Sequence, residues 1–387
     1  MICRLLHRKI FVGFLIASLT FLLVSSVSAQ VGVRSEIRIP DIPGYITLKC
    51  DFHIHTVFSD GDVWPTVRPE EAWREGLDAL AITDHIEYQP HKSDIPINHN
   101  RSYEIAAAGA QSLGIILIKG AEITREMPPG HFNALFIKDA SALDTKDFRD
   151  ALKAAAEQGG FIIWNHPGWR QPNEIPIWYD EHTEIYTNGW MNGMEIFNDA
   201  SYYPLAHQWC IDKKITLIGS SDTHSPINLQ YDFYNGEHRP MTLVFAEKKT
   251  QEAIKEALVA RRTAVYFGNT IVGEEQFLKP LFSGSIKLLT SELTITGRGS
   301  ANAQIYNDSD VGYELVSTGA VEGIRFPQSI VIPGMKTVLC RITSTSDRNS
   351  GIKTISLPYR VKNFLTAPDT GLPVELLITV TFLPSRR

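Results

Sequence analysis

Six short apolar runs recur between residues 45 and 270, and they constrain the fold more than any other feature of the sequence. The runs are ITLKCDFHIH (46–55), LDALAIT (77–83), GIILIKGAEI (114–123), GFIIWNH (160–166), GMEIFN (193–198) and ITLIGSSD (215–222). Apolar runs of this length are typical of buried strands. Segments with helical spacing separate or follow several of them, at residues 68–77, 103–114, 146–160 and 250–263. This alternation predicts parallel βαβ units, arranged as a barrel or as an open α/β sheet.

The character of the sequence changes after residue 280. Residues 286–299, 303–316, 328–343 and 372–384 are rich in Val, Ile, Thr and Leu, with Gly, Pro, Asn and Ser clustered between them. This pattern predicts a small antiparallel β domain of the sandwich type. A chain of 387 residues is long enough for two domains of ordinary size. We therefore expect an α/β domain over residues 30–275 and an all-β domain over residues 276–387, with the junction in residues 272–284.

The first 29 residues have the order of features that is typical of a secretory signal peptide. Arg4, Arg8 and Lys9 precede the apolar stretch FVGFLIASLTFLLV, and the small residues SSVSAQ follow it. The stretch is shorter than the roughly 20 residues that a membrane span needs, so we expect cleavage after Ala29 rather than an anchor. Loss of these three positive charges would change the net charge from −6 to −9. The sequence predicts an acidic protein that is periplasmic or secreted, with no stable membrane span after cleavage.

Net charge and cysteine content argue against a nucleic-acid partner, a disulfide framework and a zinc site made of cysteines. A net charge of −6, with no long run of like charges, gives no electrostatic reason to expect a nucleic-acid partner. Four cysteines without a CxxC pair indicate neither a disulfide framework nor a thiolate zinc site. We therefore expect Cys50, Cys210 and Cys340 to be small buried residues.

Histidine and acidic residues gather at the ends of the predicted strands. The first run delivers His53 and His55, and Asp60 lies in the turn that follows. The other candidates at strand ends are Asp84, His85, Glu122, His131, His166, Asp222 and His224. The carboxyl ends of barrel strands face one opening, so these side chains are expected to converge there. Imidazole and carboxylate together suit Zn, Fe or Mn ions. The ligands are too many for one ion, so we expect two or three.

Each motif alone has an ordinary structural explanation. An HxH on a strand is a weak signal, His166 before Pro167 could be a turn residue, and Glu122 alone could be a surface carboxylate. The ordered set HxH, SDG, TDH, AE, GH, NHP and SDTH is much harder to explain without metal ions. Five other histidines of the predicted domains are explained as structural residues, namely His91, His99, His182, His207 and His238. The explanation is least secure for His91.

With these motifs the sequence resembles the polymerase-and-histidinol-phosphatase (PHP) superfamily of metal-dependent phosphoesterases. The resemblance rests on HIHTVFSDG, AITDH, GAEIT, GHFNALF, NHPGW and SSDTH, which occur once each and in order. It implies an α/β fold, a distorted (β/α)7 barrel with a trinuclear metal centre, ahead of the small all-β domain. The signal peptide, PPGHFNALF and the trailing β domain resemble exported phosphodiesterases of the Sb-PDE type. They are also similar to carbaryl-hydrolase relatives, which cleave carbamate esters.

The resemblance also implies how three divalent ions (Zn, Mn or Fe) share the ligands. One ion would take His53, His55, Glu122 and Asp222. A second would share Glu122 and take His131 and His166, and a third would take Asp60, His85 and His224. Asp84 would orient a metal-bound histidine or handle protons.

Substrate contacts are expected in the loops beyond the ligands. Arg125 and Arg170 each lie within four residues of a predicted ligand, and a guanidinium group matches phosphoryl oxygens. A salt bridge on the rim explains either arginine equally well. His91 is a further candidate, as a proton donor or a substrate contact.

The expected function is that of an exported metal-dependent phosphodiesterase acting on small-molecule organophosphate diesters. Metal ions lower the pKa of bound water, and we expect a metal-bridging hydroxide to attack phosphorus. Two alternatives stay open. One is a carbamate, ester or amide hydrolase with the same centre, and the other is a non-catalytic envelope protein that binds a glycan or a partner. Intact ligand motifs argue against the second alternative.

Overall fold

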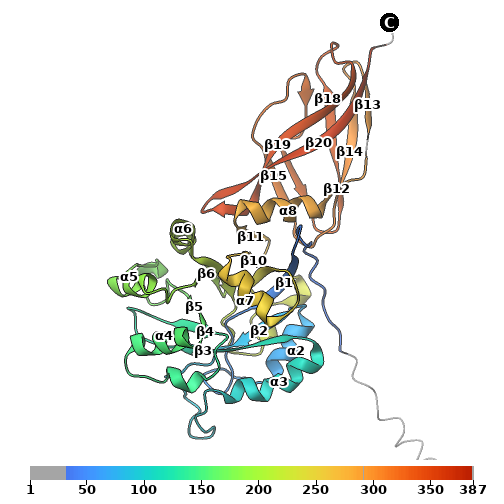
Figure 1. Ribbon diagram of the computed structural model, residues 1–387. Helices are drawn as coiled ribbons and strands as arrows, with labels where there is room; N and C mark the ends of the chain where they lie inside the picture. The colour runs from blue at the N-terminus through green and yellow to red at the C-terminus, as the bar shows by residue number, and fades with distance from the viewer. Residues whose placement is uncertain (1–31, 291, 386–387) are drawn as a thin grey trace, which may run out of the picture. The chain divides into compact units, whose positions relative to one another are not determined.

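The computed structural model describes residues 32–290 and 292–385 (Figure 1). The predicted signal peptide, residues 1–29, lies outside this part of the chain. No helix within the described residues is long and apolar enough to cross a membrane. An α/β domain is followed by an all-β domain, which confirms the predicted fold class.

Seven strands of the α/β domain follow one another around a ring. They are β1 (Ile46–Asp51), β2 (Ala79–Ile82), β3 (Ile116–Ile123), β4 (Phe132–Leu135), β5 (Phe161–Trp164), β6 (Gly193–Asn198) and β8 (Thr216–Ser220). They pair in that order. Beyond the ends of β1 and β8, an isolated parallel bridge joins Ile54 to Thr223, and the amide of His55 donates to the carbonyl of Thr223 at 3.0 Å. This contact brings the last strand back to the first, as a distorted barrel requires.

Strand β4 is not one of the six predicted strands, and it breaks the predicted parallel arrangement because it runs antiparallel to both β3 and β5. Only residues 124–131 separate β3 from β4, and a parallel crossover needs about a dozen residues or more. The reversal sets the start of β4 beside the end of β3, with Ile123 opposite Phe132. His131, just before β4, is thereby placed next to Glu122.

Helices surround these strands in Figure 1. They are α2 (Val67–Arg74), α3 (Arg101–Leu113), α4 (Phe148–Glu157), α5 (Asp180–Thr187), α6 (Pro204–Lys213) and α7 (Gln251–Val259). Four of them, α2, α3, α4 and α7, overlap the predicted helical segments, and α2 and α3 begin one and two residues earlier than predicted. The Asp147 side chain caps α4 by accepting from the amide of Arg149, and Gly159 follows its end with φ of +74°. Helices α5 and α6 lie between predicted strands and were not predicted.

A further group of strands extends the sheet beyond β1. They are β9 (Met241–Ala246), β10 (Thr263–Phe267) and β11 (Thr270–Gly273), and the short β7 (Ser201–Tyr202) lies beside β6 at the other end. Strand β9 is antiparallel to β1, and β10 and β11 form a hairpin next to it. Strand β11 then pairs with β19 of the all-β domain, Ile271 opposite Phe364. Backbone hydrogen bonding is therefore continuous between the two domains.

The all-β domain contains two sheets. Its strands are β12 (Ile286–Leu288), β13 (Leu293–Thr296), β14 (Ser300–Asn307), β15 (Tyr313–Ser317), β16 (Ile324–Arg325), β17 (Ser329–Ile332), β18 (Thr337–Ser344), β19 (Gly351–Ala367) and β20 (Thr370–Leu383). One sheet has the order β12–β14–β18–β16, and the other contains β13, β20, β19, β15 and β17. Pairing is antiparallel within the domain except between β13 and β20. Buried and exposed positions alternate along β13, β15 and β17, as expected for one face on a core.

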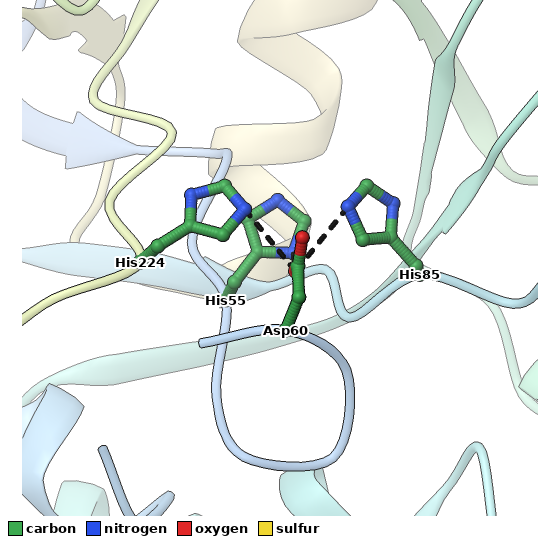
Figure 2. A group of neighbouring side chains, drawn as sticks. All are labelled: His55, Asp60, His85 and His224. Carbon is green, nitrogen blue, oxygen red and sulfur yellow. Dashed lines mark ion pairs between the residues drawn. The ribbon is translucent and has the colours of Figure 1, made fainter. Parts of the chain in front are cut away.

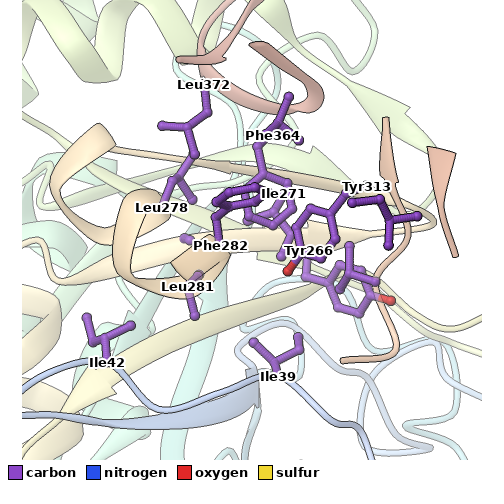
Figure 3. Packing of buried hydrophobic residues seen from close by; sticks show 14 of the residues in the cluster. Ile39, Ile42, Tyr266, Ile271, Leu278, Leu281, Phe282, Tyr313, Phe364 and Leu372 are labelled. Carbon is purple, nitrogen blue, oxygen red and sulfur yellow. The ribbon is translucent and has the colours of Figure 1, made fainter. Parts of the chain in front are cut away.

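Helix α8 (Glu275–Ser285) occupies the predicted junction and packs against both domains (Figure 3). Its Leu278, Leu281 and Phe282 belong to one buried cluster with residues of both domains. That cluster includes Ile39, Ile42, Tyr266 and Ile271 from the α/β domain and Tyr313, Phe364 and Leu372 from the all-β domain. The predicted boundary between residues 275 and 276 falls in the first turn of this shared helix. Cys50, Cys210 and Cys340 are buried and unbonded, as expected.

Candidate metal centre

The nine predicted ligands form one cluster beyond the ends of the ring strands. Their nitrogen and oxygen atoms fall into four groups, each with all its ligand atoms within 4.8 Å of one another. The groups are His55, Asp60, His85 and His224; His53, Glu122 and His166; His53, His55 and Asp222; and His85, Glu122 and His131. Because the groups share members, the nine side chains are contiguous.

His53 and His55 point the same way because they alternate along an extended segment that continues β1. Their Nε2 atoms lie 3.0 Å apart, and Oδ1 of Asp222 lies 3.1 Å from the first and 3.0 Å from the second. Ligand atoms about 2.0–2.2 Å from one zinc ion lie roughly 3–3.5 Å from each other. The three atoms thus have the spacing of ligands around a common ion.

Asp60 is the centre of a second group (Figure 2). Its Oδ1 lies 3.1 Å from Nε2 of His224, 3.4 Å from Nε2 of His85 and 3.8 Å from Nδ1 of His55. The turn at residues 56–61 carries Asp60 back over the strand end, with the amides of Ser59 and Gly61 both donating to the carbonyl of Thr56. The predicted trio of Asp60, His85 and His224 is therefore together, and His55 joins it.

Glu122, at the end of β3, lies between the groups. Its Oε1 is 3.0 Å from Nδ1 of His131 and 3.5 Å from Nε2 of both His166 and His53, and its Oε2 is 2.5 Å from Nδ1 of His85. This position suits a bridging carboxylate. His131 and His166, which are predicted to share an ion, both face Oε1 of Glu122, and Glu122 also joins His53 to His166 and His85 to His131.

The electrostatics of the cluster fit bound cations. Across the described residues, Asp60, Glu122 and Asp222 form ion pairs with histidines alone and with no lysine or arginine. Burial raises the pKa of Glu122, but the neighbouring histidines His85, His131 and His53 outweigh it and hold that pKa well below its usual range. Oδ1 of Asp60, Oε2 of Glu122 and Nδ1 of His166 are buried without a hydrogen-bond partner. Buried polar atoms without hydrogen bonds are costly, and divalent ions would supply positive charge beside the two carboxylate oxygens.

The pKa values of two histidines in the cluster shift in opposite directions. Burial lowers the pKa of His85, but Glu122 and Asp60 outweigh it and raise the pKa to about 10. Burial, with help from nearby His85, lowers the pKa of His55 to about 3. In the metal-free protein some imidazoles therefore carry protons where a metal ion would otherwise bind.

Glu195, on β6, supports the cluster and was missed in the sequence. Its Oε1 lies 2.9 Å from Nδ1 of His53, and its Oε2 accepts from the amide of His166 at 2.7 Å. Asn165 supports Glu122 in a similar way, with Nδ2 donating to Oε1 at 2.7 Å. An acidic residue inside the otherwise buried run GMEIFN was the available signal for Glu195, because a fully buried carboxylate requires partners.

Asp84 holds the turn that carries Asp60. Its carboxylate accepts from the amide of Thr56 at 2.7 Å and from the hydroxyls of Thr56 and Ser59 at 2.8 and 2.9 Å. The Ser59 hydroxyl in turn lies 3.2 Å from Nδ1 of His55. These contacts suit a role in orienting ligands, and the catalytic role of Asp84 stays a prediction.

Two ligands have left-handed backbone conformations, with φ of +25° at His166 and +53° at Asp222. For residues other than glycine such conformations cost about 1–3 kcal/mol each and tend to occur at functional sites. The hydrogen bond from the His166 amide to Glu195, and one from the Asp222 amide to the carbonyl of His53 at 2.9 Å, hold these two residues in place.

A cavity of about 790 Å³ opens beside the cluster. Asp60, His85 and His131 reach it from the cluster, and Tyr88 and Trp169 contribute aromatic walls. The ring of Trp169 lies 4.6 Å from that of His131, centre to centre, and the Arg170 guanidinium lies 4.3 Å from the Trp169 ring centre.

Both predicted substrate-binding arginines line this cavity, but their side chains differ in exposure and in the number of hydrogen bonds they make. Arg125 pairs with Glu87 and donates to the carbonyls of Thr124 and Thr145 at 2.9 and 2.8 Å, and its side chain is only 16% exposed. Arg170 contacts Glu126 at 3.1 Å, and its side chain is 58% exposed. His91 is not among the described residues that line the cavity.

Fold and cluster together define a class, namely two-domain proteins in which a distorted α/β barrel carries a metal centre of histidines and carboxylates. Comparisons with known proteins agree with this class. Residues 286–377 match the model of an Ig-like domain family. A comparison with curated proteins finds no significant match.

A solved structure from Bacteroides vulgatus identifies the family. It is a two-domain protein containing a predicted PHP-like metal-dependent phosphoesterase, with 44% sequence identity and a TM-score of 0.84, over 90% of this chain and 100% of that one. An amidohydrolase from Chromobacterium violaceum aligns with 46% of this chain and 88% of its own at 17% identity, and its TM-score of 0.35 supports no inference. The chain belongs to the two-domain PHP-like metal-dependent phosphoesterases.

Proposed function

We propose that this chain is an exported phosphodiesterase that binds three divalent ions through the nine clustered side chains. The observation that carries the proposal concerns three carboxylates, the buried Glu122 and the partly buried Asp60 and Asp222. They are surrounded by histidines, with no lysine or arginine among their ion pairs in the described residues. Zn, Mn and Fe all accept this combination of ligands. Export is proposed from the N-terminal sequence pattern, and the likeness to exported Sb-PDE-type phosphodiesterases from the ordered motifs.

The ligands would be shared as follows. His53, His55 and Asp222 would hold one ion, and Asp60, His85 and His224 a second, with His55 near both. Glu122 would bridge to a third ion at His131 and His166. Divalent ions in such a cluster supply Lewis acidity and lower the pKa of water from about 15.7 toward about 7.

The protein's own residues would orient this centre. An ionised Glu195 can only accept, so it fixes the proton of His53 on Nδ1 and leaves the Nε2 lone pair facing Asp222. Asp84 fixes the turn of Asp60 through Thr56 and Ser59. The substrate would lie in the adjoining cavity, with Tyr88 and Trp169 excluding water beside it.

The charge and size of the cavity favour a diester over a monoester. Glu87 neutralises Arg125 and Glu126 neutralises Arg170, so the arginines add little net positive charge to attract a phosphate dianion. A phosphodiester carries a single negative charge and two organic groups. A cavity of about 790 Å³ with aromatic walls has room for both groups.

An activity panel tests the proposal. Purified protein is reconstituted with Zn²⁺, Mn²⁺ or Fe²⁺ and assayed on bis(p-nitrophenyl) phosphate, p-nitrophenyl phosphate and an aryl N-methylcarbamate. We expect the highest kcat/KM on the diester, with loss of activity in Glu122→Gln. Glu256→Gln, which removes a surface carboxylate paired with Arg262, is the matched control. Preference for the carbamate would identify a carbamate hydrolase instead, and inactivity on every substrate would favour a binding protein.

A further inference from the structure

We propose that Arg68 is a positioning residue that holds two ligand-bearing segments of the metal centre in register. The proposal rests on the metal centre proposed above and extends it to a residue that touches no ion. Arg68 belongs to α2, which follows the turn that carries Asp60, and only 1% of it is exposed. Its guanidinium group points into the protein, where it contacts backbone carbonyls.

Every N–H of the Arg68 guanidinium group has an acceptor. Nε donates to the carbonyl of His55 at 2.8 Å, and Nη2 donates to the carbonyls of Thr223 and His224 at 3.1 and 2.8 Å. Nη1 donates to the carbonyl of Ser225 at 3.0 Å and to Oε2 of Glu71 at 2.8 Å. A guanidinium group has five N–H donors in a rigid plane, and all five are used here.

The carbonyls that Arg68 binds belong to the two segments that close the strand ring. His55 lies on the extension of β1, and Thr223 and His224 lie on the extension of β8. Backbone contacts also join these two segments, and the line between the segments is called the seam. They include the Ile54–Thr223 bridge, the Asp222 amide on the His53 carbonyl and the Asp62 amide on the His224 carbonyl at 2.8 Å. Arg68 adds four hydrogen bonds that span the same seam.

The distances between ligands on opposite sides of this seam would determine how well a metal ion is coordinated. Nε2 of His55 lies 3.0 Å from Oδ1 of Asp222, and the rings of His55 and His224 are stacked with centres 4.2 Å apart. In each pair one residue comes from the β1 side and the other from the β8 side. A shift between the two segments would therefore change the ligand geometry at two of the proposed ions.

Glu71 makes this arrangement rigid. Its Oε2 accepts from Arg68, and its Oε1 accepts from the amide of Ile227 at 2.9 Å. The two residues are three apart on α2, so the helix presents them as one unit. A charged pair that is buried and fully hydrogen-bonded has few alternative arrangements, and removing one partner is costly.

Lysine cannot reproduce the contacts of Arg68. An ammonium group keeps the charge but has three donors on one atom, so it cannot reach carbonyls on both sides of the seam. Arg68→Lys therefore keeps the positive charge and removes the hydrogen bonds that bridge the two segments. Arg262→Lys is a matched control, because Arg262 also binds a carbonyl, that of Phe245 at 3.0 Å, and a carboxylate, Glu256. Neither of these partners is a proposed ligand.

The experiment compares metal binding by wild type, Arg68→Lys and Arg262→Lys. Each protein is stripped with a chelator, checked by circular dichroism and thermal unfolding, and titrated with Zn²⁺ against a competing chelator. Absorption spectra of the Co²⁺-substituted proteins report ligand geometry. We expect Arg68→Lys to fold, to bind at least one Zn²⁺ about 10-fold or more weakly, as supporting residues of metal sites do, and to have an altered Co²⁺ spectrum. Arg262→Lys is expected to match wild type in both.

Equal Zn²⁺ affinities and identical Co²⁺ spectra in wild type and Arg68→Lys would overturn the proposal, even if the variant melted at a lower temperature. A wild-type protein that bound no metal would overturn the proposed function itself, which is a separate result. If Arg68→Lys does not fold, Glu71→Gln provides the same test, because it keeps Arg68 but loosens it. We expect weaker Zn²⁺ binding there as well, and unchanged binding would contradict the role of Arg68.

Discussion

His53 and Glu195 are both fully buried and lie in contact, with Nδ1 of the histidine 2.9 Å from Oε1 of the glutamate. This contact sets the direction of the His53 ring, because Nδ1 faces Glu195 while Nε2 faces Asp222 and His55. A neutral His53 with its proton on Nδ1 would offer the Nε2 lone pair to a metal ion. A carboxylate behind a metal-binding histidine fixes its tautomer and raises its basicity. Glu195 thus acts on the proposed metal through His53.

Glu195→Gln is expected to weaken metal binding by about 10- to 100-fold, the usual effect of changing a residue that supports a ligand. The amide has nearly the same shape, so the fold should be kept while the negative charge behind His53 is lost. Chelator competition with Zn²⁺ measures the effect. Glu184→Gln, which removes an exposed carboxylate paired with Arg149, serves as the control. Unchanged Zn²⁺ affinity would show that Glu195 only fills space.

Arg170 and Arg125 are expected to respond differently to substitution. Arg170→Ala removes an exposed cation at the cavity and is expected to raise KM several-fold with little change in melting temperature, since exposed ion pairs contribute about 0–1 kcal/mol. Arg125→Ala removes hydrogen bonds to two loop carbonyls and to Glu87. We expect it to cost about 1–3 kcal/mol of stability. Steady-state kinetics and denaturant unfolding of both variants measure these effects. A loss of stability in Arg170→Ala, together with a change in KM alone in Arg125→Ala, would contradict the roles assigned here.

Gly61 is required by a close approach of the backbone. A Cβ atom at this position would lie 2.8 Å from the carbonyl carbon of His55 and from the amide nitrogen of Thr56. Gly61→Ala is therefore expected to push the turn outward and displace Asp60 from His85. Metal analysis should show fewer ions bound per chain than in wild type. Gly236→Ala is a useful comparison because it has no such contact, although its φ of +83° adds local strain; full metal content in Gly61→Ala would disprove the argument.

The raised pKa of His85 predicts a pH dependence. In the metal-free protein it lies at about 10 against an ordinary 6.5, so the stabilising effect of the proton is complete below pH 6.5 and is lost as pH rises toward 10. The same proton competes with metal, so metal affinity should rise over this interval. Calorimetric Zn²⁺ titrations in two buffers of different ionisation enthalpy would reveal proton release.

The metal-loaded protein provides the control for this pH effect. Its unfolding free energy is expected to lack the loss between pH 6.5 and 10, because an ion then takes the place of the proton on His85. Buffer-independent binding heats, or a metal-free protein whose stability rises over this interval, would contradict the proposed competition.

Much of the fold followed from local patterns in the sequence. Buried strands and amphipathic helices repeat at regular spacing, so β1, β3, α4 and α7 were predictable. The reversal of β4 was not, because its four residues look the same in either direction and only the short connection 124–131 forces it. Helix α8 was also missed as a helix, since its role depends on packing against residues far away in sequence, such as Tyr313 and Phe364.

The candidate ligands were predictable for a different reason. Histidines and carboxylates at strand ends are rare enough to stand out, and their order matched a family. Of the supporting residues, Asp84 was predicted and Arg68 was not, because a buried arginine looks like any charged residue until its neighbours are known. Glu195 had a signal in its place within a buried run, but the run does not say which groups it contacts. Their partners are backbone amides and carbonyls, such as those of His166 and His224, which the sequence does not distinguish.

The metal content of the purified protein is the sharpest test of the proposed three-ion centre. Inductively coupled plasma mass spectrometry of wild type and Glu122→Gln, after gel filtration in metal-free buffer, counts the ions held per chain. We expect three divalent ions in wild type and a lower number in the variant, because Glu122 lies between the groups of ligands. A wild-type protein with at most one ion per chain and full phosphodiesterase activity would contradict it.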